Sequence, residues 1–249
     1  MDLKKKYGLI GFPLHNSFSV NFFTQKFSQA GAAHTYQNYP LANLDQLTSF
    51  LKNPENLSGF NVTKPYKEKV IPYLQSLSTE AQACGAVNCV VVSKNGDLIG
   101  HNTDIFGFKS SLLAFIGSNQ NMRALVIGNG GASKAVCYVL QQLHIPFIVA
   151  ARNGKGDYLL TEIDREMLQA HKLIIQTTPV GMFPNQLEEL PFSLEGIGKE
   201  HFCYDLIYLP EETSFLKKAK QKGSKTINGL KMLHAQAEEA YNIWMKSKT

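Results

Sequence analysis

Four short polar segments in the first 104 residues carry side chains suited to chemistry on a small substrate. Ser17 and Ser19 flank the start of an expected helix, where hydroxyl groups can bind a carboxylate. Lys67 closely follows an Asn-Val-Thr run, and Asp104 ends an Asn-Thr-Asp run. A lysine beside an aspartate can transfer a proton at a carbonyl or carbinol oxygen. The neutral side chains of these segments suit the binding of hydroxyl groups: Asn61, Thr63, Asn88 and Asn102.

Each of these residues also has an ordinary structural explanation. The serines, Asn102 and Asp104 could cap helices, Lys67 could be one exposed lysine among several, and Asn88 could interrupt a strand. The sequence shows neither a Ser-His-Asp arrangement nor a cluster of histidines, so it offers no hydrolytic triad and no metal site. Taken together, the segments favour proton transfer at an oxygen, with hydride supplied by a nicotinamide cofactor.

A glycine-rich turn lies between a buried strand and a helix in the second half of the chain. After residues 125–127, Leu-Val-Ile, come Gly128, Asn129, Gly130, Gly131 and Ala132. Gly128 would permit the tight turn, and Gly130 would let the backbone approach a pyrophosphate, which the N-terminus of the helix attracts. Ser133 occupies the third glycine position of the motif, which predicts slightly looser packing of helix on strand.

The segment that follows the next predicted strand, 146–150, helps to distinguish NAD(H) from NADP(H) as the cofactor. NAD enzymes usually carry an acid about 20 residues beyond the glycines, where it binds the ribose 2′-hydroxyl. Residues 149–155 contain no acid, but they include Arg152 and Lys155, which suit a 2′-phosphate. The sequence therefore favours NADP(H) over NAD(H), although a solvated loop arginine is the simpler alternative.

The elements that must position these residues fall into two sets. In the first hundred residues, strands are predicted at 7–10, 35–39 and 57–62, with a hairpin of 87–92 and 98–101 across Asn95-Gly96. Helices are predicted at 18–30 and 43–51, and a further helix is expected to begin at Pro65. Lys67 is thus expected in the first turn of that helix.

From about residue 104 the pattern changes to alternating helices and apolar strands. Helices are predicted at 105–116, 133–143 and 213–222, with strands at 123–127, 146–150, 172–176, 202–207 and 225–227. Near-continuous apolar strands between helices indicate a parallel sheet covered on both faces. We therefore expect a Rossmann-like, doubly wound α/β domain of about five strands over residues 104–229. A smaller α/β substrate domain would hold residues 1–103 and 230–249, and an amphipathic helix at 230–244 would return the chain to it.

Composition and charge exclude several classes of protein. The hydrophobic fraction is 44% and the charged fraction 18%, values typical of globular domains. The net charge of +5 is small, and the two lysine clusters of the chain are interpreted as solvent-exposed surface. No nucleic-acid partner is therefore expected. The four cysteines form no CxxC pair, and no apolar run is long enough to span a membrane. We expect a cytoplasmic protein without a membrane partner, and the sequence leaves monomer and homodimer open.

These segments together resemble the shikimate dehydrogenase family, which is NADP-dependent and acts in aromatic amino-acid and chorismate biosynthesis. The resemblance covers essentially the whole chain, and its most diagnostic segments are Asn-Val-Thr-Lys-Pro-Tyr-Lys67 and Asn-Thr-Asp104. Five further segments occur in the family's order: 11–19, 85–88, 128–132, 204–208 and 229–236. The activity it implies is reversible reduction of 3-dehydroshikimate to shikimate with NADPH.

The resemblance also implies a role for each matching residue. Lys67 and Asp104 match the family's catalytic pair. Binding of the substrate carboxylate is implied for Ser17, Ser19 and Tyr208, and binding of the ring hydroxyls for Thr63, Asn88 and Gln236. Cofactor binding is implied for Gly128, Asn129, Gly130, Gly131, Ala132, Arg152, Leu206 and Gly229, with Arg152 selecting NADP.

The chain departs from the family pattern in three places. Phe18 replaces a lysine between the two serines, which removes a positive charge beside the expected carboxylate site. Ala151 and Asn153 replace an asparagine and a threonine on either side of Arg152, so the threonine hydroxyl that would contact the 2′-phosphate is missing. The stretch from Arg152 to Thr177 is about a dozen residues shorter, with room for one short helix near 162–170. Two other readings stay open: an NAD-using quinate/shikimate dehydrogenase, and a non-catalytic NADP(H)-binding module.

Overall fold

The computed structural model describes residues 4–14, 18–52, 57–119, 121–152 and 154–247. The chain divides into two compact units. The first unit holds residues 1–106 and 236–249, and the second unit holds residues 107–235. Helices α4 (Thr103–Ile116) and α8 (Leu230–Lys246) carry the chain from one unit into the other. The last part of α8 belongs to the first unit, so the chain returns there, as the sequence predicted.

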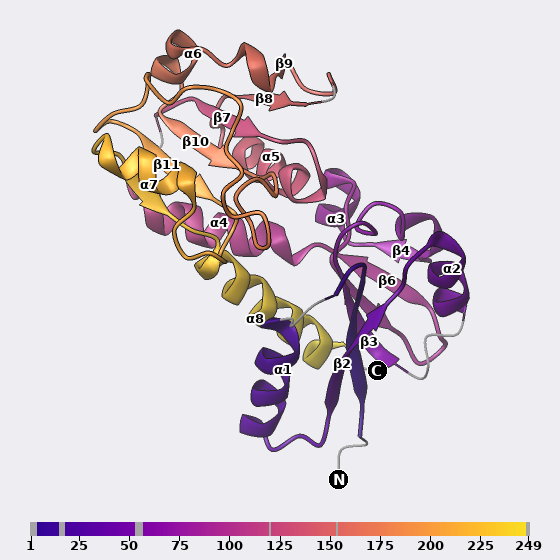
Figure 1. Ribbon diagram of the computed structural model, residues 1–249. Coiled ribbons are helices and arrows are strands. Elements are labelled where there is room, and N and C mark those ends of the chain that lie inside the picture. Colours follow the sequence, from indigo (N-terminus) through magenta and orange to yellow (C-terminus); the bar gives the residue numbers. More distant parts are fainter. Residues whose placement is uncertain (1–3, 15–17, 53–56, 120, 153, 248–249) are drawn as a thin grey trace. The chain divides into compact units, whose positions relative to one another are not determined.

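The first unit is built on a mixed sheet of six strands in the order β2-β1-β3-β5-β6-β4 (Figure 1). Its strands are β1 (Lys6–Gly11), β2 (Thr35–Pro40), β3 (Leu57–Val62), β4 (Ser76–Leu77), β5 (Cys89–Val92) and β6 (Leu98–His101). β1 pairs in parallel with β2 and β3, whereas β5 and β6 form an antiparallel hairpin whose turn contains Gly96 at φ +86°. The hairpin predicted from Asn95-Gly96 is confirmed.

Side-chain alternation along the strands creates one core on each face of this sheet. Ile10 faces a core that includes Leu47 of α2 (Leu44–Lys52). Tyr7 faces the opposite core, with Phe23 of α1 (Phe18–Gln29) and Trp244 of α8. The indole Nε1 of Trp244 donates to the carbonyl of Val90 at 3.0 Å, which fastens the end of α8 to the sheet. A short helix, α3 (Thr79–Cys84), precedes β5.

The helix expected to begin at Pro65 is absent from the structure. Residues 64–70 form turns, followed by one turn of 3₁₀ helix, η1 (Ile71–Tyr73). The carbonyls of Lys64 and Lys67 accept hydrogen bonds from Phe12 and Val87, which belong to other segments of the unit. Because Lys67 bonds to Val87, Ile71 bonds to Glu68 instead and no α-helical ladder forms. Lys67 therefore lies on a turn tied to the sheet.

The second unit contains a parallel sheet in the order β12-β11-β10-β7-β8-β9. Its strands are β7 (Ala124–Ile127), β8 (Phe147–Ala151), β9 (Tyr158–Leu159), β10 (Leu173–Gln176), β11 (Phe202–Asp205) and β12 (Lys225–Ile227). Every pairing in it is parallel. The chain runs outward from β7 to β9, then restarts at β10 on the other side of β7. This is the doubly wound order of a dinucleotide-binding domain.

The helices of the second unit are α5 (Gly131–Gln142), α6 (Arg165–Ala170) and α7 (Ser214–Gln221), besides most of α4. The sheet has one strand more than the five expected. Its sixth strand, β9, has two residues, which pair with Ala150 and Ala151 of β8. Tyr158 and Leu159 are both 41% exposed, so β9 lacks the apolar run that marks a buried strand. A 3₁₀ turn, η2 (Leu160–Glu162), and α6 then fill the shortened segment.

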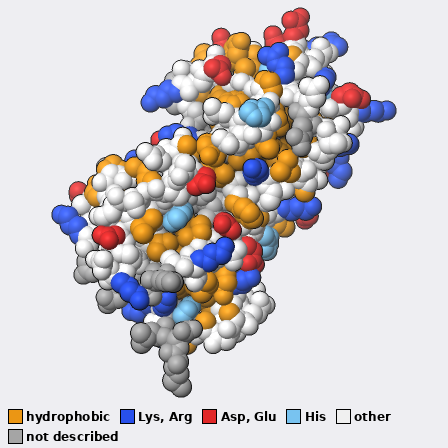
Figure 2. Space-filling view, turned by 180° about the vertical axis from the view of Figure 1, so that it is seen from behind, with side chains coloured by type: hydrophobic (Ala, Val, Ile, Leu, Met, Phe, Trp, Pro, Cys, Tyr) orange, Lys and Arg blue, Asp and Glu red, His pale blue; other side chains and the backbone are white. Residues whose placement is uncertain are grey.

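Charged side chains are dispersed over the face of the molecule seen in Figure 2. Figure 2 shows lysine and arginine side chains scattered over this face among acidic ones, without one continuous basic patch. In the described part of the chain, no helix is long and apolar enough to cross a membrane. Among the same residues, no three His, Cys, Asp or Glu side chains are grouped so as to hold a metal ion.

Candidate active site

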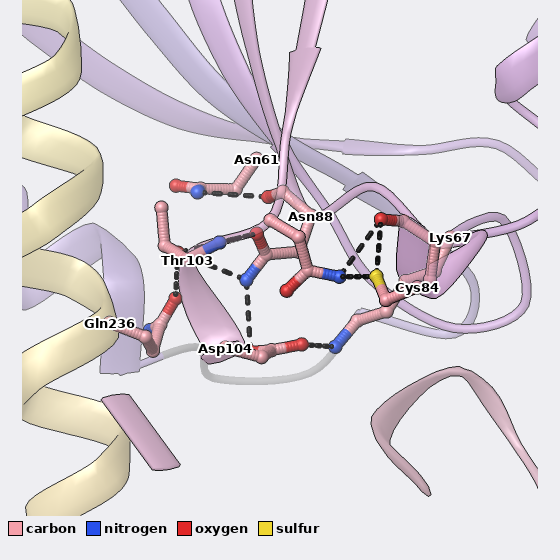
Figure 3. Close-up of polar contacts among 9 residues, drawn as sticks. Asn61, Lys67, Cys84, Asn88, Thr103, Asp104 and Gln236 are labelled. Carbon is pink, nitrogen blue, oxygen red and sulfur yellow. Dashed lines mark hydrogen bonds and ion pairs between the residues drawn. The ribbon is translucent and has the colours of Figure 1, made fainter. Parts of the chain in front are cut away.

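An ion pair between Lys67 and Asp104 belongs to a cluster of polar side chains in the first unit (Figure 3). Lys67 Nζ lies 2.6 Å from Asp104 Oδ2, and the two side chains are 20% and 8% exposed. The turn after β3 positions the lysine, and the first turn of α4 positions the aspartate, where the helix dipole favours a negative charge. A pair this buried needs further hydrogen bonds to hold its geometry.

Asn88 supplies those hydrogen bonds. It is 3% exposed, and its Nδ2 donates to Asp104 Oδ1 at 2.9 Å and to Thr103 Oγ1 at 3.1 Å. Its Oδ1 accepts from the backbone N–H of Thr103 at 2.7 Å. Both amide hydrogens are thus used within the protein. Asn88, expected to bind a substrate hydroxyl, therefore orients Asp104 in this structure.

Thr103 connects this cluster to the last helix. The side chain is fully buried, and its Oγ1 donates to Oε1 of Gln236 at 3.3 Å. Figure 3 shows Gln236 reaching the cluster from α8. The sequence placed Gln236 at the edge of the apolar stripe of this helix, where a side chain can reach a polar site. The structure brings it together with Asn88 and Asp104.

A second chain of hydrogen bonds joins Ser19 to the same cluster. The Tyr36 hydroxyl, in contact with Ser19, donates to Asn61 Oδ1 at 2.8 Å, and Asn61 Nδ2 donates to the Asn88 carbonyl at 3.1 Å. Burial raises the pKa of Tyr36 well above its usual value, although the Ser19 hydrogen bond opposes this, so Tyr36 stays a neutral donor.

The remaining predicted residues of the first unit are Ser17 and Thr63. Ser17 lies outside the described residues. Thr63 is half-buried directly after β3, and its backbone N–H donates to the Ile10 carbonyl. No role was predicted from the sequence for Tyr36 or Thr103. Tyr36 reads as a core residue of an amphipathic strand, whereas the position of Thr103 between Asn102 and Asp104 was an available signal.

The glycine-rich turn of the second unit is formed as the sequence predicted. It follows β7, and Gly128 adopts φ +109°, where a side chain would also collide with Thr177 and Thr178. Gly130 is the N-cap of α5, and a Cβ built there meets nothing within 4 Å. The open space beside Gly130 is what an approaching phosphate needs. By helix geometry, the first N–H groups of α5 have no acceptor within the helix.

Ser133, at the third glycine position of the motif, forms a hydrogen bond within this turn. Its hydroxyl is 2% exposed and donates to the carbonyl of Gly128 at 2.6 Å. The serine therefore closes the turn with a hydrogen bond where the usual glycine would allow close packing. Asn129 also ties the turn to the next loop, because its Nδ2 donates to the Lys155 carbonyl at 3.2 Å.

Arg152 follows β8 at the expected position and is exposed. The nearest acid after it is Asp157, which is engaged with the sheet edge: its Oδ2 accepts from the N–H of Val149 at 2.8 Å, and its own N–H donates to the Val149 carbonyl. Within the described residues, Arg152 makes no ion pair that would compete for an anion.

Leu206 and Gly229 meet through their backbones. Gly229 donates its N–H to the Ile207 carbonyl at 3.0 Å, and a Cβ at Gly229 would overlap the carbonyl oxygen of Leu206. The sequence therefore needs glycine here for a close approach. Tyr208, two residues beyond Leu206, is 38% exposed, and partial burial raises the pKa of its hydroxyl.

Asp205 holds this loop in place, a role that the sequence did not reveal. Its Oδ1 accepts from the N–H of Ile207 at 2.9 Å, and its Oδ2 accepts from the hydroxyl of Thr213 at 2.7 Å. Complete burial raises the pKa of the carboxyl to about 7, against the opposing effect of these two hydrogen bonds. The loop that carries Leu206 and Tyr208 is thus anchored at both ends by one side chain.

Comparison with known proteins shows which proteins this chain is similar to. Residues 9–90 match the family model described as the shikimate dehydrogenase substrate binding domain. The chain is 38% identical to the NADP⁺ shikimate dehydrogenase of Caldanaerobacter subterraneus, over 96% of this chain and 91% of that protein.

Solved structures of similar enzymes superpose on most of the chain. The shikimate 5-dehydrogenase of Thermus thermophilus, in complex with NADP(H) and shikimate, gives a TM-score of 0.85 at 30% identity, over 96% of this chain and 93% of that one. The quinate dehydrogenase of Corynebacterium glutamicum, in complex with NAD, also gives 0.85, at 27% identity over 97% and 93% of the two chains.

Proposed function

The chain belongs to the shikimate dehydrogenase family, and we propose from this premise that it reduces 3-dehydroshikimate to shikimate with NADPH, reversibly, in aromatic amino-acid and chorismate biosynthesis. The observation that carries the proposal is the Lys67–Asp104 pair, whose charged atoms lie 2.6 Å apart in a cluster of neutral hydrogen-bonding side chains. The pair is assembled within the first unit alone.

Lys67 is the proton donor in this proposal. Addition of a hydride to the substrate carbonyl carbon builds negative charge on its oxygen, and the ammonium of Lys67 transfers a proton to that oxygen. The product is a secondary alcohol, and in the reverse direction Lys67 takes the proton back. Asp104 holds the ammonium in position and accepts a hydrogen bond from Asn88, so the pair is oriented before substrate arrives.

The side chains predicted from the sequence are chemically suited to the substrate's own groups. We assign its carboxylate to Ser17, Ser19 and Tyr208, and its ring hydroxyls to Thr63, Asn88 and Gln236, and Asn88 also orients Asp104. Hydroxyl groups can donate to a carboxylate without a formal charge. Because Phe18 stands where the family usually has lysine and stacks on Phe22 at a centroid distance of 5.4 Å, carboxylate recognition depends on these neutral donors.

The second unit fits a dinucleotide phosphate. The open space at Gly130 and the N-terminus of α5 suit the pyrophosphate, with Gly128 through Ala132 around it, and Arg152 suits the 2′-phosphate. Leu206 and Gly229 would lie by the nicotinamide. When bound, NADPH supplies the hydride for the carbonyl carbon. The chain's residues bind and orient it, and Lys67 supplies the proton.

An NAD-using quinate or shikimate dehydrogenase is the second candidate, because the Corynebacterium quinate dehydrogenase superposes well. The exposed Arg152 and the engagement of Asp157 with Val149 favour the NADP reading. A non-catalytic NADP(H)-binding module is disfavoured by the intact Lys67–Asp104 pair.

The deciding experiment follows NADPH absorbance after addition of 3-dehydroshikimate, with NADH and quinate as the competing cofactor and substrate. We expect turnover with NADPH and 3-dehydroshikimate, and a lower kcat/KM with NADH. Preferred turnover of quinate with NAD⁺ would establish the second candidate, and no turnover with any pair would support the non-catalytic module.

We also propose that the enzyme works in the cytoplasm. All four cysteines are free thiols, and Cys84, Cys89 and Cys203 are buried. Reduced thiols of this kind are the norm where glutathione and thioredoxin keep cysteines unpaired. Fractionation of cells, followed by immunodetection of the chain, tests this location.

A further inference from the structure

The segment Gly85–Asn88 holds both members of the Lys67–Asp104 pair. The N–H of Val87 donates to the carbonyl of Lys67 at 2.8 Å, which fixes the backbone of the lysine. The side chain of Asn88 donates to the carboxylate of Asp104 at 2.9 Å. A displacement of this four-residue segment would therefore move the lysine and the aspartate relative to each other.

Asn102 fastens that segment in turn. Its Nδ2 donates to the carbonyl of Ala86 at 2.8 Å and contacts Cys84 Sγ at 3.2 Å, and the residue is only 7% exposed. Because the Ala86 carbonyl can only accept, it determines which end of the Asn102 amide faces the segment.

The orientation of the amide separates Asn102 from an ordinary helix cap. Asn102 directly precedes α4, where asparagine usually accepts a hydrogen bond from the helix through its side-chain oxygen. Among the described residues, Oδ1 of Asn102 is buried and has no hydrogen-bond partner. An unsatisfied buried oxygen costs stability, whereas an apolar side chain of similar volume would avoid that cost. The orientation of the amide therefore serves its donor, Nδ2, which donates to the carbonyl of Ala86.

We infer that Asn102 is a positioning residue for the Lys67–Asp104 pair, acting through the Ala86 carbonyl and the segment Gly85–Asn88. The inference rests on the proposed function, because it assigns Asn102 to the proton transfer made by that pair. Asn102 itself touches neither Lys67 nor the reacting atoms. Its effect is geometric: it holds the segment from which Val87 and Asn88 reach the pair.

The test compares Asn102→Leu with a matched control in the same unit, Gln75→Leu. Gln75 Oε1 accepts from the N–H of Leu98, at the other end of β6, so both variants remove one side chain to main chain hydrogen bond. We expect kcat for 3-dehydroshikimate reduction to fall about 10- to 100-fold in Asn102→Leu, the scale of a small misplacement of catalytic groups. Gln75→Leu should retain the wild-type kcat, and both variants should retain the wild-type KM for NADPH.

The Lys67→Ala background separates positioning from general damage. If Asn102 acts through the pair, adding Asn102→Leu to Lys67→Ala causes little further loss of kcat, since there is no lysine left to position. An equal loss in both backgrounds, or unchanged kcat in Asn102→Leu, overturns the inference. Near-normal kcat in Lys67→Ala overturns instead the proposed role of the pair. If Asn102→Leu does not fold, Asn102→Ala, which also lacks the donor, is measured in the same way with the same expected losses.

Discussion

The two units build their candidate sites from different parts of the chain. In the first unit, side chains hold one another: Asn88 orients Asp104, and Asp104 pairs with Lys67. In the second unit, the expected dinucleotide site is mainly backbone, with Gly128 at a positive φ and Gly130 open to its surroundings. The first site is therefore sensitive to removal of side chains, and the second is sensitive to their addition.

This difference has a physical origin in what each site must bind. Proton transfer needs one ionisable group at a defined position, and a satisfied polar network fixes that position. A pyrophosphate is bound by several main-chain N–H groups at a helix N-terminus, for which bulky side chains are obstacles. Variants that remove or add side chains test both statements.

Removing the lysine should give the largest effect. Lys67→Ala should lower kcat by roughly 10²- to 10⁴-fold, the usual contribution of general acid–base catalysis. The affinity for NADPH should change little, because the glycine-rich turn belongs to the other unit. Stopped-flow NADPH absorbance gives kcat, and fluorescence titration gives the dissociation constant.

The Asp104→Ala and double variants sharpen this prediction. Since both residues act on one proton, the double variant should be little worse than the worse single variant. Fully multiplicative losses would show that the two side chains contribute independently and would contradict the shared role.

Adding a side chain to the glycine-rich turn should give the next largest effect. Gly130→Val places methyl groups where a phosphate would approach, and should weaken NADPH binding on the order of 10²- to 10³-fold, the loss of about two charge-assisted hydrogen bonds. The fold should survive, because a Cβ at Gly130 meets nothing within 4 Å. Calorimetric titration and thermal melts measure the two quantities.

Gly198 offers a matched control for this variant. It lies in the same unit, and a Cβ there also meets nothing within 4 Å. Gly198→Val should leave NADPH affinity unchanged. Comparable losses of affinity in both variants would mean that Gly130 does not face the cofactor.

Arg152 is the exception in the second unit, a side chain expected to bind directly. Arg152→Ala should raise KM for NADPH by about 10- to 150-fold, since one charge-assisted contact to the 2′-phosphate contributes ~1.5–3 kcal/mol. KM for NADH should change much less. Arg165→Ala removes another exposed arginine of the same unit as a control. Equal effects of Arg152→Ala on KM for both cofactors would contradict the assignment of Arg152 to the 2′-phosphate.

The sequence predicted most of the architecture because the strands and helices carry strong local patterns. The apolar runs of β7, β10 and β11, the hairpin at Gly96 and the glycine-rich turn are all confirmed. The two-residue strands β4 and β9 are too short to carry such a pattern. The helix expected at Pro65 was wrong because distant partners, Phe12 and Val87, take the carbonyl groups that it needed.

The candidate site, like the fold, was predicted only in part from the sequence. Lys67 and Asp104 were found from residue types and resemblance, and the structure places them in contact. Their support was not predictable, because Tyr36, Asn88 and Asn102 act through hydrogen bonds between segments far apart in the chain. A side chain that binds another side chain has the same sequence signature as one that binds a ligand.

Asp205 tests the comparison through stability rather than through activity, because it is a buried side chain that supports a loop in the second unit, whose dinucleotide site is mainly backbone. Its pKa is raised from the ordinary value of 3.8 to about 7 by burial. The folded state therefore binds the proton more tightly than the unfolded state. The stability that this proton contributes is fully present below about pH 4 and is lost as the pH rises to about 7.

Asp205→Asn removes this titration and keeps an oxygen that can accept from the N–H of Ile207. The melting temperature of the variant relative to the wild type should therefore rise between pH 5 and pH 8, by about 5–10 °C for a loss of ~2–3 kcal/mol in the wild type. The titration of all other groups cancels in this difference. Differential scanning calorimetry at several pH values measures it. A difference that stays flat across this range would mean that Asp205 ionises without cost, and that backbone contacts alone hold the loop bearing Leu206 and Tyr208.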